Sequence, residues 1–528
     1  METKVIRLLN VKCAPPRSVK PCKPETVLFS WPDDVHVAFD PNSLCAVQVD
    51  AAAAHKLEKG PDGFTGLLFS GVAPEFPPPA GGPERAERVE RVRKLVLNLT
   101  HACNLRCKYC FAADYDGVPG GAHGAPAMPP ETAFKALSLF DDGVNRQARC
   151  AGAPVAKDAK SEISNQKSEF RNRAPLSVSF FGGEPLLAWP TLILTAERIY
   201  QLAYERKVSY SLHVTTNGTL ITPLKAAALK RFNFSVLLSL DGPKEIHNAS
   251  RPTAADAAVN SQITGAPCAP RNRQSPIANH PSSFDLAMSG LDALNAAGII
   301  PSIRATFSEL PAQLVERLEF FDALYRLGKI SGVSIEPAIL AEGCASVPQT
   351  EMDLARLEEE WHAAAEWFVE RARAGKPFPF FYFRKILARL LNCEFHGSEC
   401  GAGRGYLTVG PDGKIFACHR ESGTAIGHLP DPSDQSNPSF DSSARQPWLR
   451  NCINEHPECA ECWARYLCGG GCAQNRVEIG GAVTAPVPNV CAARRVMMKQ
   501  VLWIAAQLTQ EEALKAAGLG ADERGREK

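Results

Sequence analysis

The chain has no long apolar segment. No run approaches the roughly 20 apolar residues that would cross a bilayer as a helix. The N-terminus, Met-Glu-Thr-Lys-Val-Ile-Arg, has no apolar core of the kind found in signal peptides. We therefore expect no membrane partner and a cytoplasmic location.

The chain also has no excess of charge of either sign. Lys and Arg together number 58, and Asp and Glu number 57. The sequence contains no basic stripe of the kind that follows a nucleic-acid backbone, so no nucleic-acid partner is expected. The 528 residues are enough for more than one domain, and a hydrophobic share of 45% is ordinary for a globular protein.

Cysteine, by contrast, is abundant, with 18 residues of which most fall in two groups. The others are scattered without a pairing pattern, which argues against the disulfide framework of a secreted protein. Grouped thiols without disulfides are typical of metal sites in a reducing compartment.

The first group comprises Cys103, Cys107 and Cys110, in the spacing C-x3-C-x2-C. Three thiolates can hold three irons of a [4Fe–4S] cube and leave the fourth iron open to a small molecule. The group directly follows an apolar stretch at 94–99 that has the character of a strand. The cysteines are therefore expected in a loop at the carboxyl end of a strand, where α/β barrels build their sites.

Three further segments follow predicted strands, and together with the cysteines they resemble the motifs of radical S-adenosylmethionine (SAM) enzymes. They are Phe180-Phe-Gly-Gly-Glu-Pro185, Thr215-Thr-Asn-Gly218 and Ser239-Leu-Asp-Gly-Pro243. The alternative for the cysteines alone is a zinc site or a chance cluster. The resemblance implies that SAM is bound by residues that include Tyr109, Gly182, Gly183, Glu184, Ser239 and Arg251.

The second group lies near the C-terminus and resembles the SPASM extension of peptide-modifying radical SAM enzymes. The resemblance implies two auxiliary [4Fe–4S] clusters, and so three such clusters and SAM as the cofactors. The alternative is a pair of structural zinc sites, since C-x2-C is also a zinc signature. The implied ligands are Cys400, Cys418 and Cys472 for the first cluster, with Cys393 as a fourth, and Cys459, Cys462, Cys468 and Cys491 for the second.

The middle of the chain alternates strand and helix patterns, which predicts an α/β fold with a parallel sheet. The resemblance likewise implies a partial (β/α)6 barrel. Polar segments near 147–174 and 252–281 interrupt the pattern and are interpreted as insertions. The predicted strands are 94–99, 177–181, 211–215, 235–239, 301–306 and 332–336, and the predicted helices are 131–140, 191–205, 223–232, 284–297 and 312–327.

The chain divides into four predicted parts: 1–83, 84–345 as the barrel, 346–518 as a helical bridge with the SPASM domain, and a tail at 519–528. The first part is a small α+β unit with strands at 26–30, 35–39 and 45–49, a helix at 51–59 and a proline-rich linker at 74–83. Its layout resembles leader-peptide recognition domains, which add a peptide as a strand to a sheet edge. The alternative is a structural cap.

The local sequence around the second group, such as Cys400-Gly-Ala-Gly403, resembles that of maturases that install thioether crosslinks in ribosomal peptides. Maturases of quinohaemoprotein amine dehydrogenases are similar. Sulfatase maturases carry a catalytic Asp directly after the cysteine equivalent to Cys418, where this chain has His419. His419 is a candidate base, or alternatively a donor to a cluster sulfur.

The expected activity is reductive cleavage of SAM and radical modification of a ribosomal peptide or protein, with thioether crosslinks as the expected product. A peptide that carries a leader sequence is among the expected substrates. A reductant such as a flavodoxin or ferredoxin is an expected partner. The alternatives are a formylglycine-forming sulfatase maturase, radical chemistry on a small molecule, and a non-catalytic iron–sulfur or leader-binding scaffold. The intact cysteine triad, together with Glu184, Ser239 and Arg251, argues against the scaffold.

Overall fold

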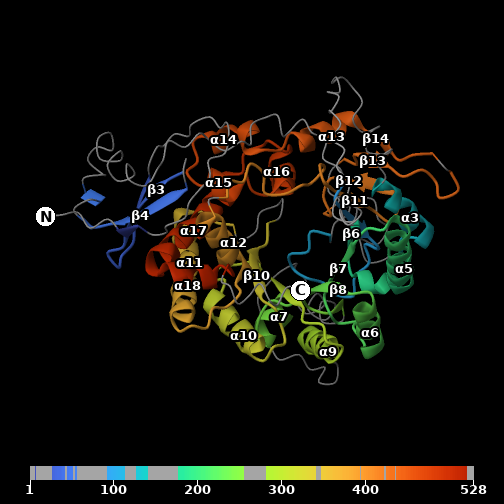
Figure 1. Ribbon diagram of the computed structural model, residues 1–528, viewed down its shortest axis with the longest axis horizontal. Helices are drawn as coiled ribbons and strands as arrows, with labels where there is room; N and C mark the ends of the chain where they lie inside the picture. The colour runs from blue at the N-terminus through green and yellow to red at the C-terminus, as the bar shows by residue number, and fades with distance from the viewer. Residues whose placement is uncertain are drawn as a thin grey trace, which may run out of the picture.

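The computed structural model describes residues 6–7, 27–41, 44–51, 54–55, 92–112, 126–140, 176–254, 281–339, 347–392, 394–420, 424–434 and 436–519 (Figure 1). The predicted linker at 74–83, the insertion at 147–174, most of that at 252–281 and all but the first residue of the predicted tail at 519–528 lie outside these residues.

A parallel sheet forms the centre of the molecule, and its six strands confirm the prediction. Each strand pairs in parallel with the next one along the chain. Burial alternates along β6, because one face of the sheet packs on helices and the other faces the barrel interior. The strands are β5 (Lys94–Asn98), β6 (Leu176–Phe181), β7 (Tyr210–Thr216), β8 (Phe234–Ser239), β9 (Ser302–Phe307) and β10 (Val333–Pro337).

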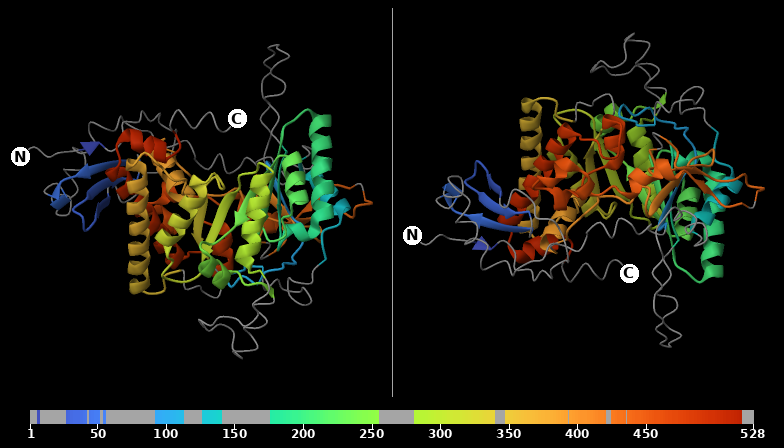
Figure 2. Two further views of the ribbon diagram at one scale, coloured as in Figure 1. Left: turned by 90° about the horizontal axis from the view of Figure 1, so that it is seen from below. Right: turned by 90° about the horizontal axis from the view of Figure 1, so that it is seen from above.

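Helices connect these strands and cover the outer face of the sheet, as Figures 1 and 2 show. Their starts carry clear signals: the Thr222 hydroxyl accepts from the backbone of Lys225, and Ser282 and Asp285 form a capping box. The helices are α3 (Pro130–Ala136), η3 (Leu137–Phe140), η4 (Pro185–Ala188), α5 (Trp189–Arg206), α6 (Pro223–Arg231), α7 (Lys244–Ser250), α9 (Ser283–Ala296) and α10 (Leu314–Arg326).

The sheet continues past β5 into the C-terminal part of the chain, which the sequence did not reveal. β11 (Tyr406–Val409) runs parallel to β5, with Tyr406 opposite Lys94. The backbone N–H of Lys94 also donates to the carbonyl of Gly405 at 3.0 Å. β12 (Lys414–Phe416), β13 (Gly427–His428) and β14 (Ser439–Phe440) then follow in antiparallel order.

A helical layer flanks the β10 end of the sheet (Figure 1). Its longest members are α11 (Glu351–Arg373) and α17 (Pro488–Gln507), which pack against each other. Trp361 of α11 is fully buried among aromatic rings that include Phe380 and Phe383. The other C-terminal helices are α12 (Phe381–Leu391), α13 (Ser442–Leu449), η5 (Ile453–Glu455), α14 (Pro457–Ala460), α15 (Arg465–Cys468), α16 (Ala473–Gly480) and α18 (Gln510–Ala516).

The N-terminal strands form a separate antiparallel sheet in the order β1-β4-β3-β2. They are β1 (Ile6–Arg7), β2 (Val27–Ser30), β3 (His36–Asp40) and β4 (Cys45–Val49), and the last three confirm the prediction. The predicted helix at 51–59 lies mostly outside the described residues.

One face of this sheet packs on the C-terminal helical layer, and Figure 2 shows the two side by side. Val37 and Phe39 are fully buried in the hydrophobic core to which α17 also contributes. The ring of Phe29 lies 4.7 Å from that of Trp463, and Trp503 Nε1 donates to Asp33 at 3.1 Å. The sheet therefore depends on the C-terminal helices for its core, while the predicted boundary at residue 83 stays a prediction.

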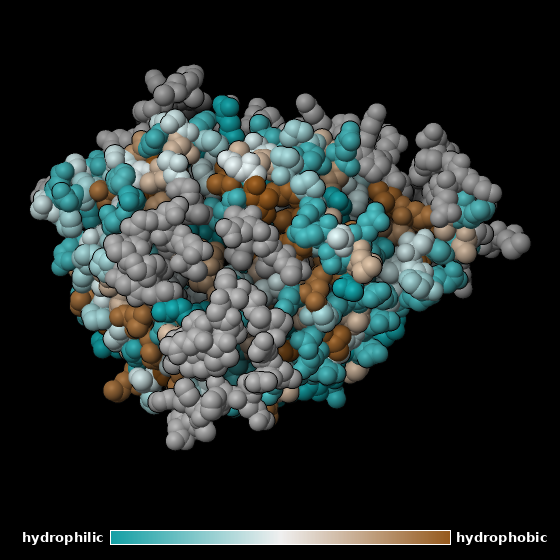
Figure 3. All heavy atoms as spheres, turned by 180° about the vertical axis from the view of Figure 1, so that it is seen from behind, coloured by the Kyte–Doolittle hydropathy of each residue, from teal (hydrophilic) through white to brown (hydrophobic). Residues whose placement is uncertain are grey.

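None of the helices within the described ranges is both long and apolar enough to cross a membrane. On the face drawn in Figure 3, hydrophobic residues reach the surface in several small groups that hydrophilic residues separate.

The shared core predicts a measurable cost for a cavity in the N-terminal sheet. Phe39→Ala should lower the free energy of unfolding by roughly 3 to 5 kcal/mol, because the site is closed on both sides and cannot collapse. Tyr204→Ala is the matched control, since that ring is 81% exposed. Thermal unfolding of the two variants measures the difference. Equal midpoints would contradict the shared core.

Candidate active site

The first cysteine group occupies a loop that leaves the carboxyl end of β5, as predicted. The backbone N–H of Cys110 donates to the carbonyl of Cys107 at 3.1 Å, which closes a tight turn. Arg106 donates through its backbone to the carbonyl of Pro252 at 2.9 Å and so fastens the loop to the segment after α7. Burial raises the pKa of Cys103 to about 11 and that of Cys107 to about 12. These thiols need a bound cation to ionise at neutral pH.

Two glycines after β6 let the next loop lie directly on the cysteine loop. Gly182 has φ +142°, and a Cβ there would stand 2.3 Å from the carbonyl oxygen of Thr100. A Cβ on Gly183 would stand 2.3 Å from the carbonyl oxygen of Ala102. The backbone N–H of Gly183 donates to Thr100 at 2.8 Å. A side chain at either position would push the two loops apart.

Glu184 fixes the ends of β6 and β7 relative to each other. Its buried carboxylate accepts from the Thr216 hydroxyl at 2.7 Å, from the backbone of Asn217 at 2.8 Å and from that of Leu186 at 3.1 Å. Burial raises its pKa in spite of these donors. The side chain is therefore engaged within the protein, and its predicted contribution to SAM binding stays a prediction.

Asp241, after β8, joins several predicted site residues and is called the hub of the site below. The sequence analysis noted its motif, Ser239-Leu-Asp-Gly-Pro243, but did not predict Asp241 as a site residue. Its carboxylate accepts from the Tyr109 hydroxyl at 2.5 Å and from the backbone of Thr306 at 2.9 Å. Arg251 pairs with it at 3.0 Å and lies 5.3 Å from the Tyr109 ring. Burial opposes ionisation of Asp241, but the charge of Arg251 prevails and lowers its pKa.

This hub brings two predicted site residues, Tyr109 and Arg251, onto one carboxylate. Ser239, a third, is buried at the end of β8, two residues before Asp241. Arg317 of α10 donates to the backbone carbonyl of Asp241 and, at 2.8 Å, to that of Ala312. The side of the cysteine loop nearest β8 is thus held by buried ionic contacts.

The β11–β12 hairpin lies among the three predicted ligands of the first auxiliary cluster. Cys400 precedes β11, Cys418 follows β12, and Cys472 caps the start of α16. Burial, together with the charges of Cys472 and Cys400, raises the pKa of Cys418 to about 12. The three thiols therefore lie within electrostatic reach of one another, and their role as ligands of one cluster stays a prediction.

The remaining four cysteines gather around α14, α15 and α17. Burial raises the pKa of Cys459 to about 12, and the neighbouring Cys468 and Cys462 add to the rise. Burial and the same two thiols raise the pKa of Cys491. Cys468 and Cys472 are close in sequence but belong to different groups. The intervening Gly469, Gly470 and Gly471 reverse the chain with φ of 65°, 82° and 74°.

The donor sets are all thiols, in groups of three, three and four. Within the described part of the chain, no three His, Cys, Asp or Glu side chains are close enough to share a single metal ion. All-thiol sets of this kind suit a [4Fe–4S] cube, in which each iron takes one thiolate. The number of clusters stays a prediction. Cys393 lies outside the described residues, so its role as a ligand stays a prediction.

His419 stands where the two cysteine regions meet. Its ring lies 4.7 Å from Phe181 and 6.0 Å from Phe111, which directly follows the first cysteine group. Tyr406 accepts from the backbone N–H of His419 at 2.8 Å, and its hydroxyl lies 2.7 Å from Nδ1. Nδ1 is therefore already engaged in a hydrogen bond with the Tyr406 hydroxyl. Burial lowers the pKa of His419 to about 3, so the ring is neutral.

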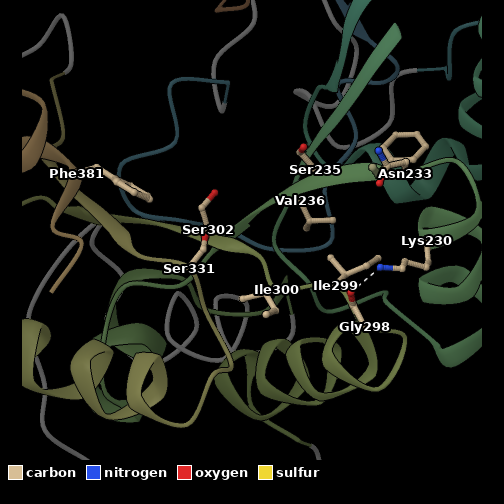
Figure 4. Close-up of a pocket in the computed structure, with 11 residues that line it drawn as sticks. Lys230, Asn233, Ser235, Val236, Gly298, Ile299, Ile300, Ser302, Ser331 and Phe381 are labelled. Atoms are coloured by element: carbon tan, nitrogen blue, oxygen red, sulfur yellow. Dashed lines mark hydrogen bonds between the residues drawn. The ribbon is translucent and has the colours of Figure 1, made fainter. Parts of the chain in front are cut away.

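A hollow of 460 Å³ lies at the amino ends of β8, β9 and β10, opposite the ends that carry the cysteine loop. Figure 4 shows Ser235, Ser302 and Ser331 around it, at the starts of β8, β9 and β10. Lys230 reaches across its edge to the carbonyl of Gly298 at 2.8 Å. None of the predicted site residues lines this hollow.

The contact between the two loops predicts that Gly183 is intolerant of a methyl group. Gly183→Ala should cost about 1 to 3 kcal/mol or more, because the added Cβ meets backbone atoms that cannot move aside. Gly397→Ala is the control, since nothing lies within 4 Å of a Cβ there. Thermal unfolding measures the midpoints of the two variants, and that of Gly183→Ala should be the lower. An unchanged midpoint for Gly183→Ala would show that the loops are not packed as described.

Comparison with known proteins agrees with this geometry. Residues 97–261 match the family model of the Radical SAM superfamily. The radical SAM cyclopropyl synthase TigE of Paramaledivibacter caminithermalis is 29% identical over 168 residues, 31% of this chain and 30% of TigE. A cysteine-type anaerobic sulfatase-maturating enzyme of Clostridium perfringens is 24% identical over 72% of this chain and 89% of its own length.

Among solved structures, that of anSMEcpe with bound AdoMet matches with a TM-score of 0.55 and 17% identity. The match covers 80% of this chain and 97% of the other, and shows a common fold. The chain therefore contains a radical SAM domain and is homologous to TigE and to the anaerobic sulfatase-maturating enzymes.

Proposed function

We propose that this protein is a radical SAM enzyme that modifies a peptide or protein with the help of two auxiliary clusters. One observation carries the proposal. β11 pairs in parallel with β5, and the ring of His419, which directly follows Cys418, lies 6.0 Å from that of Phe111 and 4.7 Å from that of Phe181. This supports a substrate site between the two cysteine regions. A substrate residue held between the two regions would lie near both.

The first cysteine group would hold the cluster that binds SAM, with Cys103, Cys107 and Cys110 as its ligands. When bound, this cluster supplies the electron that cleaves SAM and so generates the radical. The protein orients SAM through the loops at the ends of β6 and β8, where Gly182, Gly183, Glu184 and Ser239 lie. Asp241 holds Tyr109 and Arg251 in place while keeping their buried polar groups paired.

The second group would hold the two auxiliary clusters. Cys400, Cys418 and Cys472 would bind the first, and Cys459, Cys462, Cys468 and Cys491 the second. If Cys393 is a fourth ligand of the first cluster, that cluster is closed and serves electron transfer only. The electrons would come from a carrier of the flavodoxin or ferredoxin class. We assign His419 to positioning beside Cys418, because its Nδ1 is already hydrogen-bonded to the Tyr406 hydroxyl.

The local sequence around the C-terminal cysteines favours thioether formation on a ribosomal peptide as the reaction. Formylglycine formation is the second candidate. It is supported by similarity to cysteine-type and serine-type sulfatase-maturating enzymes over 72% and 70% of this chain. The anSMEcpe fold has also been solved with a bound Cp18Cys peptide. His419 in place of the catalytic Asp weighs against this second candidate.

Mass analysis of the product separates these candidates and tests the function. A thioether retains the substrate sulfur and removes two hydrogens, whereas formylglycine formation from cysteine removes the sulfur. Incubation with SAM, a reductant and cysteine-containing peptides that include a sulfatase-derived one should therefore give a diagnostic mass change. SAM cleavage without modification of any peptide would leave the small-molecule alternative as the better account.

The proposal predicts the effect of removing the first cysteine group. Replacement of Cys103, Cys107 and Cys110 by Ala should abolish 5′-deoxyadenosine formation. Bound iron in the reconstituted protein should fall from about twelve to about eight per chain, because one cube of three is lost. Iron analysis and chromatography of the nucleoside measure both. Wild-type SAM cleavage, or zinc in place of iron in the parent protein, would refute the assignment.

The N-terminal sheet is proposed to bind a leader segment at the free edge of β2. In the described part of the chain, β2 pairs only with β3. The backbone N–H of Trp31 donates to Val35 at 3.0 Å. Since hydrogen-bonded pairs alternate in an antiparallel ladder, the N–H groups of Leu28 and Ser30 point away from β3. They are available to a peptide added as a strand.

Leu28→Pro tests this edge without breaking the β2–β3 ladder. It should weaken modification of a full-length precursor several-fold, because it removes one outward N–H. Modification of an excised core peptide should not change. Leu28→Ala is the matched control for the lost side chain. Binding of the leader to each full-length variant is measured alongside. Equal leader binding and equal precursor modification by the two variants would support the alternative, in which the sheet is a structural cap.

A further inference from the structure

Three arginines surround the second auxiliary group, and each bonds a different cysteine. Arg494 Nε donates to Cys468 Sγ at 3.3 Å, and Arg476 donates to Cys459 Sγ at 3.8 Å. Arg495 forms a hydrogen bond with Cys462, and its charge also acts on Cys491. All four thiols of the group therefore feel at least one guanidinium charge.

Arg476 is fixed in place. Its side chain is 1% exposed, and its other N–H groups donate to the carbonyls of Gly470 at 3.1 Å and Ala485 at 2.8 Å. Glu458 pairs with the same guanidinium and offsets part of its charge. The contact to Cys459 is therefore built into the structure and does not depend on a mobile surface side chain.

Arg494 has weaker compensation from carboxylates. The carboxylate of Glu399 acts on its guanidinium, but Glu399 already pairs with Lys385 and, at 3.0 Å, with Arg389. The Nε–H of Arg494 is directed at the sulfur of Cys468.

The other cysteine groups also feel guanidinium charges, of Arg251 at Cys107 and of Arg404 at Cys400. The donors to their sulfurs are backbone N–H groups and, at Cys103, also the side-chain amide of Asn217 at 3.9 Å. Backbone N–H groups of Ala402 and Ala473 reach Cys400, and that of Arg420 reaches Cys418. The guanidinium of Arg420 acts on Cys418 as well, but it forms an ion pair with Glu478. In the loop after β5, the backbone N–H of Leu105 reaches Cys103 at 3.5 Å.

This difference has a direct consequence for redox chemistry. Reduction of an iron–sulfur cluster adds one negative charge, which hydrogen bonds to the sulfurs and nearby cations stabilise. The effect is stronger where water is excluded. Trp463, next to Cys462, packs against Phe29 and Phe39 of the N-terminal sheet, which covers this side of the group.

We propose that Arg476, Arg494 and Arg495 raise the reduction potential of the cluster at Cys459, Cys462, Cys468 and Cys491 above those of the other two. They act as positioning residues toward the sulfurs and touch no substrate. This inference rests on the proposed function, because it requires the three clusters. One electron from a carrier of the flavodoxin or ferredoxin class then comes to rest on this cluster first.

The test is a potentiometric titration of the reconstituted holoenzyme, followed by electron paramagnetic resonance. Cys459→Ala identifies the signal of the second auxiliary cluster by its loss. In the parent protein this signal should appear at the highest potential of the three. Arg494→Gln should shift it to lower potential and leave the other two unchanged, whereas Arg494→Lys should restore part of the shift. The exposed Arg356→Gln on α11 is the control for a general loss of charge.

Iron content separates failure of this inference from failure of the proposed function. A parent protein with far fewer than about twelve irons would refute the three clusters. Full iron with an unshifted signal in Arg494→Gln would overturn the role of the arginines alone. If Arg494→Gln loses the cluster, Arg495→Gln and Arg495→Lys give the same comparison at Cys462. An unshifted signal there would equally overturn the inference.

Discussion

The parallel pairing of β11 with β5 is the constraint on which the arrangement of the site depends. It joins two segments that lie some 300 residues apart in the chain, with Tyr406 opposite Lys94 and Val409 opposite Leu97. Asn98 at the end of β5 adds a side-chain hydrogen bond to the carbonyl of His419 at 2.8 Å. Because Cys418 precedes His419, the register of this one pairing sets the separation of the two cysteine regions.

Buried charges are compensated differently around the first cysteine group and around the second auxiliary group. Around the first cysteine group, Asp241 gathers Tyr109 and Arg251, so a buried cation is matched by a buried anion. Breaking such a pair leaves an uncompensated charge, which is more costly than never having had it. Around the second auxiliary group, arginines face thiols directly, as Arg494 faces Cys468. There the bound cluster itself would complete the charge balance.

The proposed leader site on the N-terminal sheet would connect these features to substrate selection. Its buried face rests on α17 and on Trp463, so its position relative to the second auxiliary group is fixed. Its β2 edge remains available for pairing within the described residues. A peptide added there would extend a sheet that is already rigidly docked. Such tethering raises the effective concentration of the distant residue at the site.

The sequence alone determined the six parallel strands and the cysteine spacings, because alternation of apolar residues and C-x3-C-x2-C are local patterns. It also singled out Gly182 and Gly183. The structure explains why glycine is required there, because a Cβ would collide with the backbone carbonyls of Thr100 and Ala102. The hub at Asp241, the arginines on the sulfurs and the β5–β11 pairing were decided only by tertiary structure. Each joins residues far apart in the chain, and no local pattern records which distant partner a buried charge or a strand edge will find.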